Sequence, residues 1–262
     1  FKEFPLPTPN SGPHGLTEDK DGNVWYTGNS AALIGKVDAK TGKVTEYKMP
    51  DPKARDPHTP IFDGRGVLWF TVQGGNFVGT LNPADGKIAL VSAPTPNARP
   101  YGIKLNSKGV PFFDLFGTNK IGSIDPATMK ITEYPLPAAE ARPRRIAVAK
   151  DDTIYYTDYG RGFLGHLDPK TGRVEEHASP GGAKSRPYAI AITSDGAVWY
   201  AETGDDAHNM LVRFDPATKK MQSFAIPGGG GTVRHMVVGR NDELWLAESG
   251  VGKIARVRWR AE

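Results

Sequence analysis

Apolar and polar positions alternate in short runs along the whole chain, and turn-forming residues separate these runs. The stretch from Ile131 to Val174 shows the pattern most clearly. Its runs are rich in β-branched and aromatic residues, as β-strands are, and turns such as Lys150-Asp151-Asp152 and Tyr159-Gly160 close them. The four runs are Ile131–Leu136, Arg145–Ala149, Thr153–Thr157 and Phe163–Leu167. Together they predict one four-stranded antiparallel meander.

The meander recurs along the chain. An aromatic pair or its equivalent returns about every 43 to 47 residues, which is the period of a four-stranded propeller blade. These pairs are Trp25-Tyr26, Trp69-Phe70, Phe112-Phe113, Tyr155-Tyr156, Trp199-Tyr200 and Trp245-Leu246. A second landmark keeps the same period, at Pro13-His14, Pro57-His58, Pro100-Tyr101, Pro143-Arg144, Pro187-Tyr188 and Arg234-His235. The repeats predict an all-β fold, a single six-bladed β-propeller domain over residues 1–262, with repeats at about 1–44, 45–88, 89–131, 132–174, 175–221 and 222–262.

One strand of each repeat resembles ITEYPLP, and we expect it to be the outermost, fourth strand of a blade. Five copies are Val44–Pro50, Ile88–Pro94, Ile131–Pro137, Val174–Pro180 and Met221–Pro227. The sixth is Phe1–Pro7, whereas the last repeat supplies only three strands and ends near Ile254–Trp259. We therefore expect the N-terminal strand to pair into the last blade, which would close the ring and leave no open strand edge.

Four of the predicted third strands carry a glycine, at positions 35, 79, 122 and 165. Glycine inside a strand often marks a close approach of another backbone. We therefore expect neighbouring backbones to come close at these positions.

Composition and charge exclude several classes of protein. An apolar fraction of 38% with 31 Gly and 22 Pro suits a turn-dense β protein. The net charge of +4 is small and Lys and Arg are scattered, so we expect no nucleic-acid partner. The absence of Cys excludes disulfides and thiol chemistry. We also expect no membrane span, because no apolar run is long enough to cross a bilayer. We expect the protein to be a monomer.

The chain begins at Phe1 rather than Met. Removal of a leader peptide would explain this start and would indicate a periplasmic or secreted bacterial protein. Trimming of a cytoplasmic protein explains it equally well, and both locations stay open.

The loops on one side of the predicted propeller are long and irregular, whereas those opposite are short turns such as Asp21-Gly22 and Asp195-Gly196. Long loops over a rigid scaffold are where sites are usually built. Residues that enter the innermost strands on this side form one ring, namely His14, His58, Tyr101, Arg144, Tyr188 and His235. Residues that leave the second strands form another, namely Gly28, Val72, Asp114 or Leu115, Asp158, Glu202 and Glu248. Converging charged groups need water, a metal or a ligand, so we expect a small-molecule or peptide-lactone ligand in a central funnel. His166 and His177 are expected on the surface.

The phrases ITEYPLP, RPYGI, NKIGSIDP and VWYTGN resemble the virginiamycin B lyase, or streptogramin lyase, family over nearly the whole chain. The resemblance implies a propeller enzyme that opens a cyclic depsipeptide antibiotic by elimination, with Mg²⁺ and a histidine general base. It implies that His235 is the base and that Glu248 is a catalytic carboxylate that binds the metal. In such a reaction a neutral imidazole takes a proton α to a carbonyl, and a hard cation stabilises the enolate-like charge.

The rest of the site follows from this hypothesis. Glu202 supplies a second metal-binding carboxylate, and the substrate-binding residues are His14, His58, Tyr101, Arg144, Asp158 and Tyr188. The sequence departs from the family pattern in three ways. The family has an acidic residue two positions before the base and a second histidine in the preceding blade, where this chain has Val233 and Tyr188. The family enzyme has seven blades, whereas six are predicted here.

Two other functions stay open. A lactonase similar to the six-bladed gluconolactonases would use Asp158, Glu202 and Glu248 to hold a metal that activates water. A non-catalytic binding propeller would use the arginines of the loop side to bind an anionic ligand or partner. Those arginines are Arg99, Arg142, Arg144, Arg145, Arg186 and Arg234.

Overall fold

The computed structural model describes residues 2–204 and 208–259. Nearly all of its regular structure is strand, and the helical elements are three short 3₁₀ turns, η1 (Asn29–Ala31), η2 (Gly182–Lys184) and η3 (Pro227–Gly229). Within those described ranges, no helix has the length and apolar character needed to cross a bilayer. The chain divides into two compact units, Phe1–Glu133 and Tyr134–Glu262.

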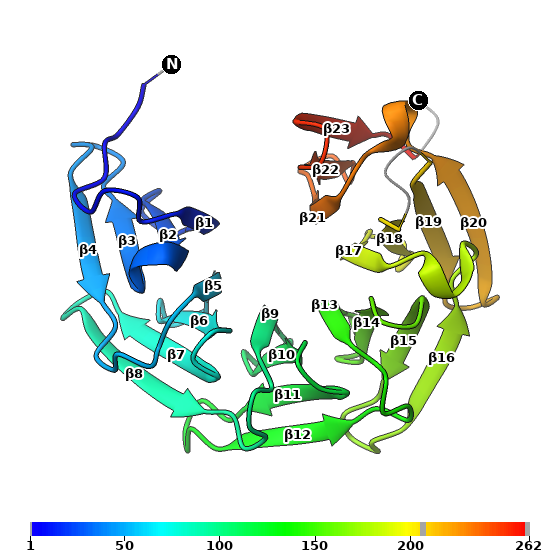
Figure 1. Cartoon of the computed structure of the whole chain (residues 1–262), viewed down its shortest axis with the longest axis horizontal. Coiled ribbons are helices and arrows are strands. Elements are labelled where there is room, and N and C mark those ends of the chain that lie inside the picture. Colours follow the sequence, from blue (N-terminus) through cyan, green and yellow to red (C-terminus); the bar gives the residue numbers. More distant parts are fainter. Residues whose placement is uncertain (1, 205–207, 260–262) are drawn as a thin grey trace. The chain divides into compact units, whose positions relative to one another are not determined.

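The first unit contains three four-stranded antiparallel blades (Figure 1). Blade 1 consists of β1 (Pro13–Glu18), β2 (Val24–Gly28), β3 (Leu33–Val37) and β4 (Val44–Lys48). Blade 2 consists of β5 (Pro57–Phe62), β6 (Leu68–Val72), β7 (Phe77–Asn82) and β8 (Lys87–Ser92). Blade 3 consists of β9 (Pro100–Leu105), β10 (Pro111–Leu115), β11 (Lys120–Ile124) and β12 (Ile131–Pro135), whose last residues cross the boundary between the units.

The second unit contains two four-stranded blades and a three-stranded one (Figure 1). Blade 4 consists of β13 (Pro143–Val148), β14 (Ile154–Asp158), β15 (Phe163–Leu167) and β16 (Val174–Ala178). Blade 5 consists of β17 (Pro187–Ile192), β18 (Val198–Glu202), β19 (Met210–Asp215) and β20 (Lys220–Ala225). Blade 6 consists of β21 (Val233–Val238), β22 (Leu244–Glu248) and β23 (Lys253–Val257). The predicted fold class, an all-β six-bladed propeller, is confirmed.

The predicted meander is shifted by one strand. The run Ile131–Leu136 corresponds to β12, which pairs with β11 and therefore belongs to blade 3. The meander is formed instead by β13, β14, β15 and β16. Alternation of apolar residues identifies a strand but not its neighbour, because pairing depends on the whole sheet.

The predicted closure by the N-terminal strand is not what the structure shows. Blade 6 has three strands, and residues 2–6 belong to no strand, while Phe1 lies outside the described residues. Side-chain contacts hold this segment against blade 1 instead. The ring of Phe4 lies over Gly42, and Thr8 donates to Glu46 from its backbone N (3.2 Å) and its hydroxyl (2.6 Å).

The same contacts recur in blades 2 and 3. Tyr47, on β4, lies over Gly86, and Thr95 donates to Glu133 from its backbone N (2.9 Å) and its hydroxyl (2.6 Å). The N-terminal segment therefore lies, relative to blade 1, where a preceding fourth strand would lie, although it forms no β-ladder.

The third-strand glycines are covered by aromatic rings rather than by another backbone, which corrects the prediction. A Cβ built on Gly165 would lie 1.9 Å from the ring of Tyr156, and one on Gly35 would lie 2.0 Å from the ring of Tyr26. Gly79 and Gly122 face Phe70 and Phe113 in the same way. Each ring and its glycine are directly paired across the second and third strands.

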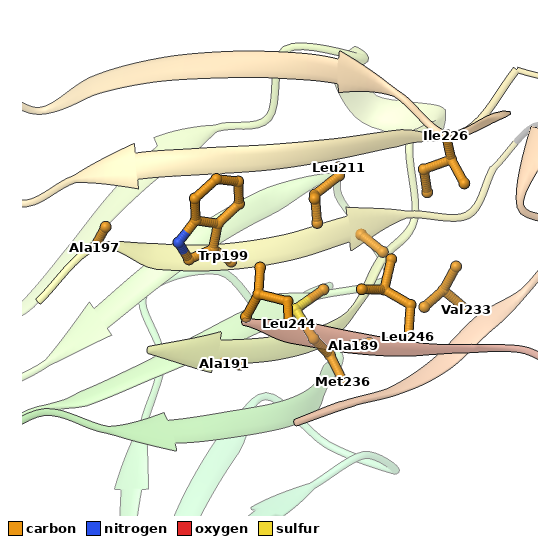
Figure 2. Packing of buried hydrophobic residues seen from close by; sticks show 11 residues of the cluster. Ala189, Ala191, Ala197, Trp199, Leu211, Ile226, Val233, Met236, Leu244 and Leu246 are labelled. Atoms are coloured by element: carbon orange, nitrogen blue, oxygen red, sulfur yellow. The ribbon is translucent and has the colours of Figure 1, made fainter. Parts of the chain in front are cut away.

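The second-strand aromatics form the core between blades. Trp199 packs in a cluster with Leu211 of its own blade and Met236 of blade 6 (Figure 2). The equivalent residues Trp25, Trp69, Phe112, Tyr155 and Trp199 are 0–5% exposed. The equivalent residue of blade 6, Trp245, is 36% exposed.

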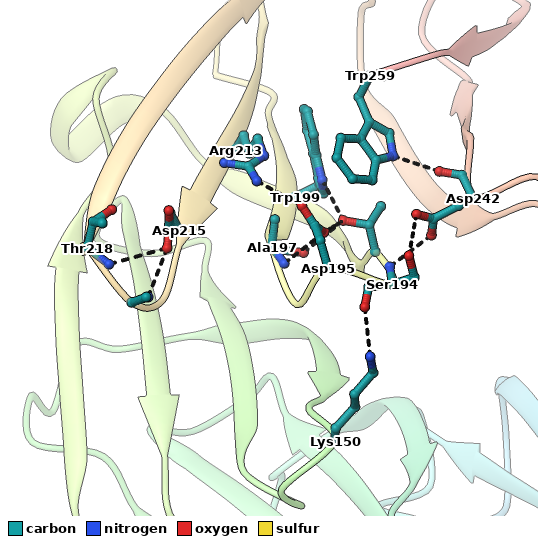
Figure 3. A network of polar contacts seen from close by, with 12 residues as sticks. Lys150, Ser194, Asp195, Ala197, Trp199, Arg213, Asp215, Thr218, Asp242 and Trp259 are labelled. Atoms are coloured by element: carbon teal, nitrogen blue, oxygen red, sulfur yellow. Dashed lines mark hydrogen bonds and ion pairs between the residues drawn. The ribbon is translucent and has the colours of Figure 1, made fainter. Parts of the chain in front are cut away.

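Turns on the side opposite the long loops link blades 4, 5 and 6 (Figure 3). The backbone N and the hydroxyl of Ser194 donate to the side-chain carboxylate of Asp242, at 2.8 Å and 2.7 Å. The indole N–H of Trp259 donates to the carbonyl oxygen of Asp242 at 2.7 Å, and Lys150 donates to that of Ser194 at 2.7 Å. These bonds fix the blades of this unit at one end.

Candidate functional site

Each first strand contains a β-bulge near its start. In blade 5, Pro187 pairs with Glu202, and two residues, Tyr188 and Ala189, then lie opposite a single residue of β18. Corresponding shifts occur in all six blades. A bulge redirects side chains and is common beside functional sites. The predicted first ring therefore lies where the strands are locally irregular.

In the first unit, the predicted substrate-binding residues His14, His58 and Tyr101 are brought together. The ring centroids of His14 and His58 are 4.4 Å apart, and those of His58 and Tyr101 are 3.9 Å apart. His14 is exposed, whereas His58 and Tyr101 are only 2% and 4% exposed. The three rings form a row that is open to solvent at His14.

Sequence reasoning missed a carboxyl near His14. Asp56 directly precedes Pro57 and has a left-handed backbone, with φ of 58°. Burial raises the pKa of the Asp56 carboxyl, although hydrogen bonds from Asn29 and Gln73 and the influence of His14 act in the opposite direction. A carboxyl with a raised pKa is a candidate for proton transfer. The only signal in the sequence was an acidic loop residue directly before a Pro-His pair.

Threonine hydroxyls of the second strands hold the ring residues of the next blade in place. The threonines share one repeat position, and each donates to the carbonyl oxygen of a bulge residue. The bonds are Thr27 to His58 (3.0 Å), Thr71 to Tyr101 (2.6 Å) and Thr157 to Tyr188 (2.8 Å). These threonines are fully buried, so the hydrogen bonds add to the packing between blades.

In the second unit, Arg144 lies between two tyrosines. Its guanidinium carbon is 4.2 Å from the ring centroids of both Tyr159 and Tyr188. The guanidinium of Arg186 lies 5.5 Å from the centroid of Tyr159. Tyr188 is 1% exposed, so its ring packs against Arg144 and does not face solvent. Cation–π contacts of this kind hold an arginine head group in a fixed orientation.

His235 does not occupy the ring position that the sequence predicted. Val233 pairs with Glu248, as Pro187 pairs with Glu202, so Arg234 rather than His235 is the equivalent of Tyr188. The prediction matched Arg234-His235 to the Pro-containing pairs, but in blade 6 the strand begins one residue earlier, without a proline to mark it.

By this register, His235 shares its repeat position with Arg145 of blade 4 and Ala189 of blade 5. The guanidinium Nη2 of Arg145 is 3.0 Å from Nε2 of His235. An arginine has only donors, so this contact is a hydrogen bond only when Nε2 accepts it. Arg145 is 6% exposed, whereas His235 is exposed.

Asp158, a predicted substrate-binding residue, is completely buried. Its oxygens accept from the backbone N of Arg142 (2.9 Å) and of Gly160 (3.1 Å), and from Nε of Arg161 (2.7 Å). The structure therefore places this carboxylate in a loop-stabilising network and does not bring it to the exposed side of the first strands.

Glu202, a predicted metal ligand, is 4% exposed. One oxygen accepts from the Ser179 hydroxyl (2.5 Å) and from the backbone N of Gly181 (2.7 Å). Burial, and to a smaller extent the Glu202 carboxylate, raises the pKa of the neighbouring Tyr200 phenol well above its usual range. Glu202 is thus occupied in fixing the loop between blades 4 and 5.

Glu248 ends β22 and is 2% exposed. In the second ring, Leu115 rather than Asp114 holds the equivalent position, because Leu115 pairs with Pro100. Over the parts of the chain that the structure describes, no three His, Cys, Asp or Glu side chains lie together so as to hold a metal ion. The Mg²⁺ site at Glu202 and Glu248 stays a prediction.

Comparisons with known proteins agree with the fold. The model of the Virginiamycin B lyase family matches residues 1–209. A solved virginiamycin B lyase from Staphylococcus aureus is 29% identical with a TM-score of 0.87, over 97% of this chain and 83% of that one. A catalytically inactive histidine-to-alanine variant of this lyase, solved with quinupristin, is 28% identical with a TM-score of 0.88, over 98% of this chain and 85% of that one. Hydrazine synthase from Kuenenia stuttgartiensis, 19% identical with a TM-score of 0.80 over 96% of this chain and 78% of that one, shares the fold alone. No curated protein matches.

Proposed function

Because the chain belongs to the virginiamycin B lyase family, we propose that it opens a cyclic depsipeptide by elimination, with His235 as the general base. The observation that carries this proposal is the exposed imidazole of His235, whose Nε2 lies 3.0 Å from the guanidinium Nη2 of Arg145. Only a neutral imidazole can take a proton, and a histidine is the most common general base. The loss of activity in the histidine-to-alanine variant of the S. aureus lyase supports a histidine-dependent reaction.

In the proposed reaction His235 removes a proton from the carbon α to a carbonyl. The electron pair of that C–H bond moves toward the carbonyl oxygen, and then forms a carbon–carbon double bond as the bond to the ester oxygen breaks. The ester leaves as a carboxylate, so the ring opens without addition of water. His58, Tyr101 and Tyr188 are too buried to meet a large ligand with their whole rings, whereas His14 and Arg144 are the more accessible of the predicted binding residues.

Incubation with quinupristin, followed by liquid chromatography and mass spectrometry, tests the proposal. Elimination gives a product of unchanged mass and altered retention. We expect this product from the wild-type chain and none from His235→Ala, whereas His177→Ala serves as a histidine control and keeps activity. A product heavier by one water would indicate a lactonase instead, and full activity of His235→Ala would exclude His235 as the base.

The same assay addresses the metal. Reactions with Mg²⁺ and with EDTA are run side by side, and loss of product with EDTA would support the predicted cation, with Glu248 and Glu202 as its candidate ligands. The alternative of a binding propeller is supported by the fixed guanidinium of Arg144 between Tyr159 and Tyr188. Unchanged quinupristin in all reactions would favour that alternative.

A further inference from the structure

Arg145 and His235 meet across the middle of the second unit although they lie two blades apart. They occupy the same repeat position on β13 and β21, and both strands pack against β17, which lies between them. The residue of β17 at this position is Ala189. Ala189 belongs to the buried core cluster with Trp199 and Met236, so β17 places an apolar residue where β13 and β21 place Arg145 and His235.

We propose that Arg145 is the positioning residue of His235, holding the imidazole neutral with its ring proton on Nδ1 and its Nε2 lone pair directed toward β13. The distance of 3.0 Å is that of a good hydrogen bond. Because the guanidinium cannot accept a proton, only the Nδ1–H form of the ring satisfies the contact. Free histidine prefers the opposite form, with its proton on Nε2, so the contact reverses the ordinary preference.

Arg145 is itself held in place. It is 6% exposed and its guanidinium carbon lies 5.9 Å from the ring centroid of Tyr188. Its backbone carbonyl oxygen lies 3.3 Å from the buried hydroxyl of Thr157, which donates to the carbonyl oxygen of Tyr188 at 2.8 Å. A buried, oriented donor loses little freedom when it binds an acceptor, and this makes it an effective director of a neighbouring ring.

The role of Arg145 in the reaction rests on the proposed function. When substrate binds, the substrate carbonyl oxygen replaces Nε2 of His235 as the acceptor of the Arg145 N–H. The Nε2 lone pair of His235 is then free to take the α proton of the substrate. The negative charge that develops on that oxygen then lies beside the guanidinium, which stabilises it. His235 later loses the proton to solvent, and no further reactant is needed.

Nuclear magnetic resonance of the full chain labelled with ¹⁵N-histidine tests the tautomer directly, with the His235 signal assigned by its loss in His235→Gln. We expect Nδ1–H in the wild type and predominantly Nε2–H in Arg145→Met. Arg145→Lys should keep Nδ1–H, because an ammonium also has only donors. Arg186→Met, which removes an arginine beside Tyr159, is the matched control and should leave the tautomer unchanged.

Arg145→Leu provides a second test that removes the donor with a differently shaped apolar side chain, and we expect it to shift His235 to Nε2–H as Arg145→Met does. It also decides the matter if Arg145→Met fails to fold in a circular dichroism melt. Nε2–H in the wild type, or an unchanged tautomer in both folded variants, would overturn the proposal. With quinupristin, kcat of Arg145→Met should fall by roughly a hundredfold. A wild type that leaves quinupristin intact would refute the lyase function, while the tautomer measurement would still decide the role of Arg145.

Discussion

The carboxylate of Glu133 joins a loop to two strands of blade 3. It accepts from the backbone N and hydroxyl of Thr95 and forms an ion pair with Lys120 at 2.7 Å. Glu133→Gln should lower the free energy of unfolding at pH 7 by about 1.5–3 kcal/mol, the usual value of hydrogen bonds to a charged group. Urea denaturation measures this loss, and the exposed Glu140→Gln should change stability by less than about 0.5 kcal/mol.

The same residue gives a prediction with pH. Burial alone would raise the pKa of Glu133, but the hydrogen bonds from Lys120 and Thr95 outweigh it and lower the pKa below its ordinary value. A lowered pKa means that the stabilisation is complete above the pKa of the unfolded chain and is lost as pH falls through that of the folded chain. The difference between wild type and Glu133→Gln should therefore be constant from pH 6 to 8 and shrink below about pH 4. A constant difference down to pH 3 would contradict this account.

At the residue scale, sequence reasoning found the residue types of the site but not their surroundings. Asp158 and Glu202 were predicted correctly to end their strands, yet both carboxylates turn away into loop networks. The contact between Arg145 and His235 depends on the bulges near the start of β13 and β21. Such features follow from the pairing of strands that are far apart in sequence, and a single sequence does not contain that information.

At the scale of one blade, the pairing of glycine with an aromatic ring fixes the distance between second and third strands. Gly165→Ala should reduce the free energy of unfolding by about 1–3 kcal/mol, because its methyl group would overlap the ring of Tyr156. Gly64→Ala is the control, since the region around Gly64 is open and a Cβ there would meet nothing within 4 Å. Equal stability of the two variants in thermal melts would show that the ring moves freely.

Packing between blades gives a second prediction at this scale. Trp199→Ala should cost about 3–5 kcal/mol, because it leaves a cavity in the core between blades 5 and 6. Trp245→Ala removes the equivalent residue from the partly exposed face of blade 6 and should cost less than about 2 kcal/mol. The two residues are 2% and 36% exposed. Equal losses in denaturant titrations would indicate that something covers Trp245 in solution.

At the scale of the whole molecule, ionisable groups in different blades change stability in the same direction with pH. The pKa values of Asp63, Glu133 and Asp195 are lowered by hydrogen bonds that outweigh burial, and those of His166 and His177 are lowered by burial. The two histidines were predicted to lie on the surface, but the structure shows that both are half-buried.

Every one of these groups binds protons more readily in the unfolded chain, so stability should fall as pH decreases. For the histidines the fall begins below about pH 6.5, with a slope of at most about 1.4 kcal/mol per pH unit for each proton. Urea denaturation from pH 8 to 5 measures this slope, and His166→Gln should flatten it. An unchanged slope would mean that His166 titrates alike in both states.

The sequence alone was sufficient for the number and class of blades, because a repeat signals itself by periodic aromatic residues and turns. It was not sufficient for the closing strand. The segment Phe1–Pro7 has the residues of a fourth strand, and Phe4 and Thr8 make a fourth strand's contacts with the next blade. Its backbone pairing is a separate property, since a ladder requires a partner strand in register as well as a suitable sequence.

The contact of Tyr47 with Gly86 has a consequence for building longer or shorter versions of this protein. Tyr47 belongs to the fourth strand of blade 1, whereas Gly86 lies in the last turn of blade 2. Copying blade 2 as it is seen, residues 57–92, would separate the two partners. Copying residues 44–86 would carry both. The segment to duplicate therefore starts with the fourth strand of one blade and ends after the third strand of the next. A designer who adds a blade should place the junctions within blades, just before their fourth strands, and not between blades.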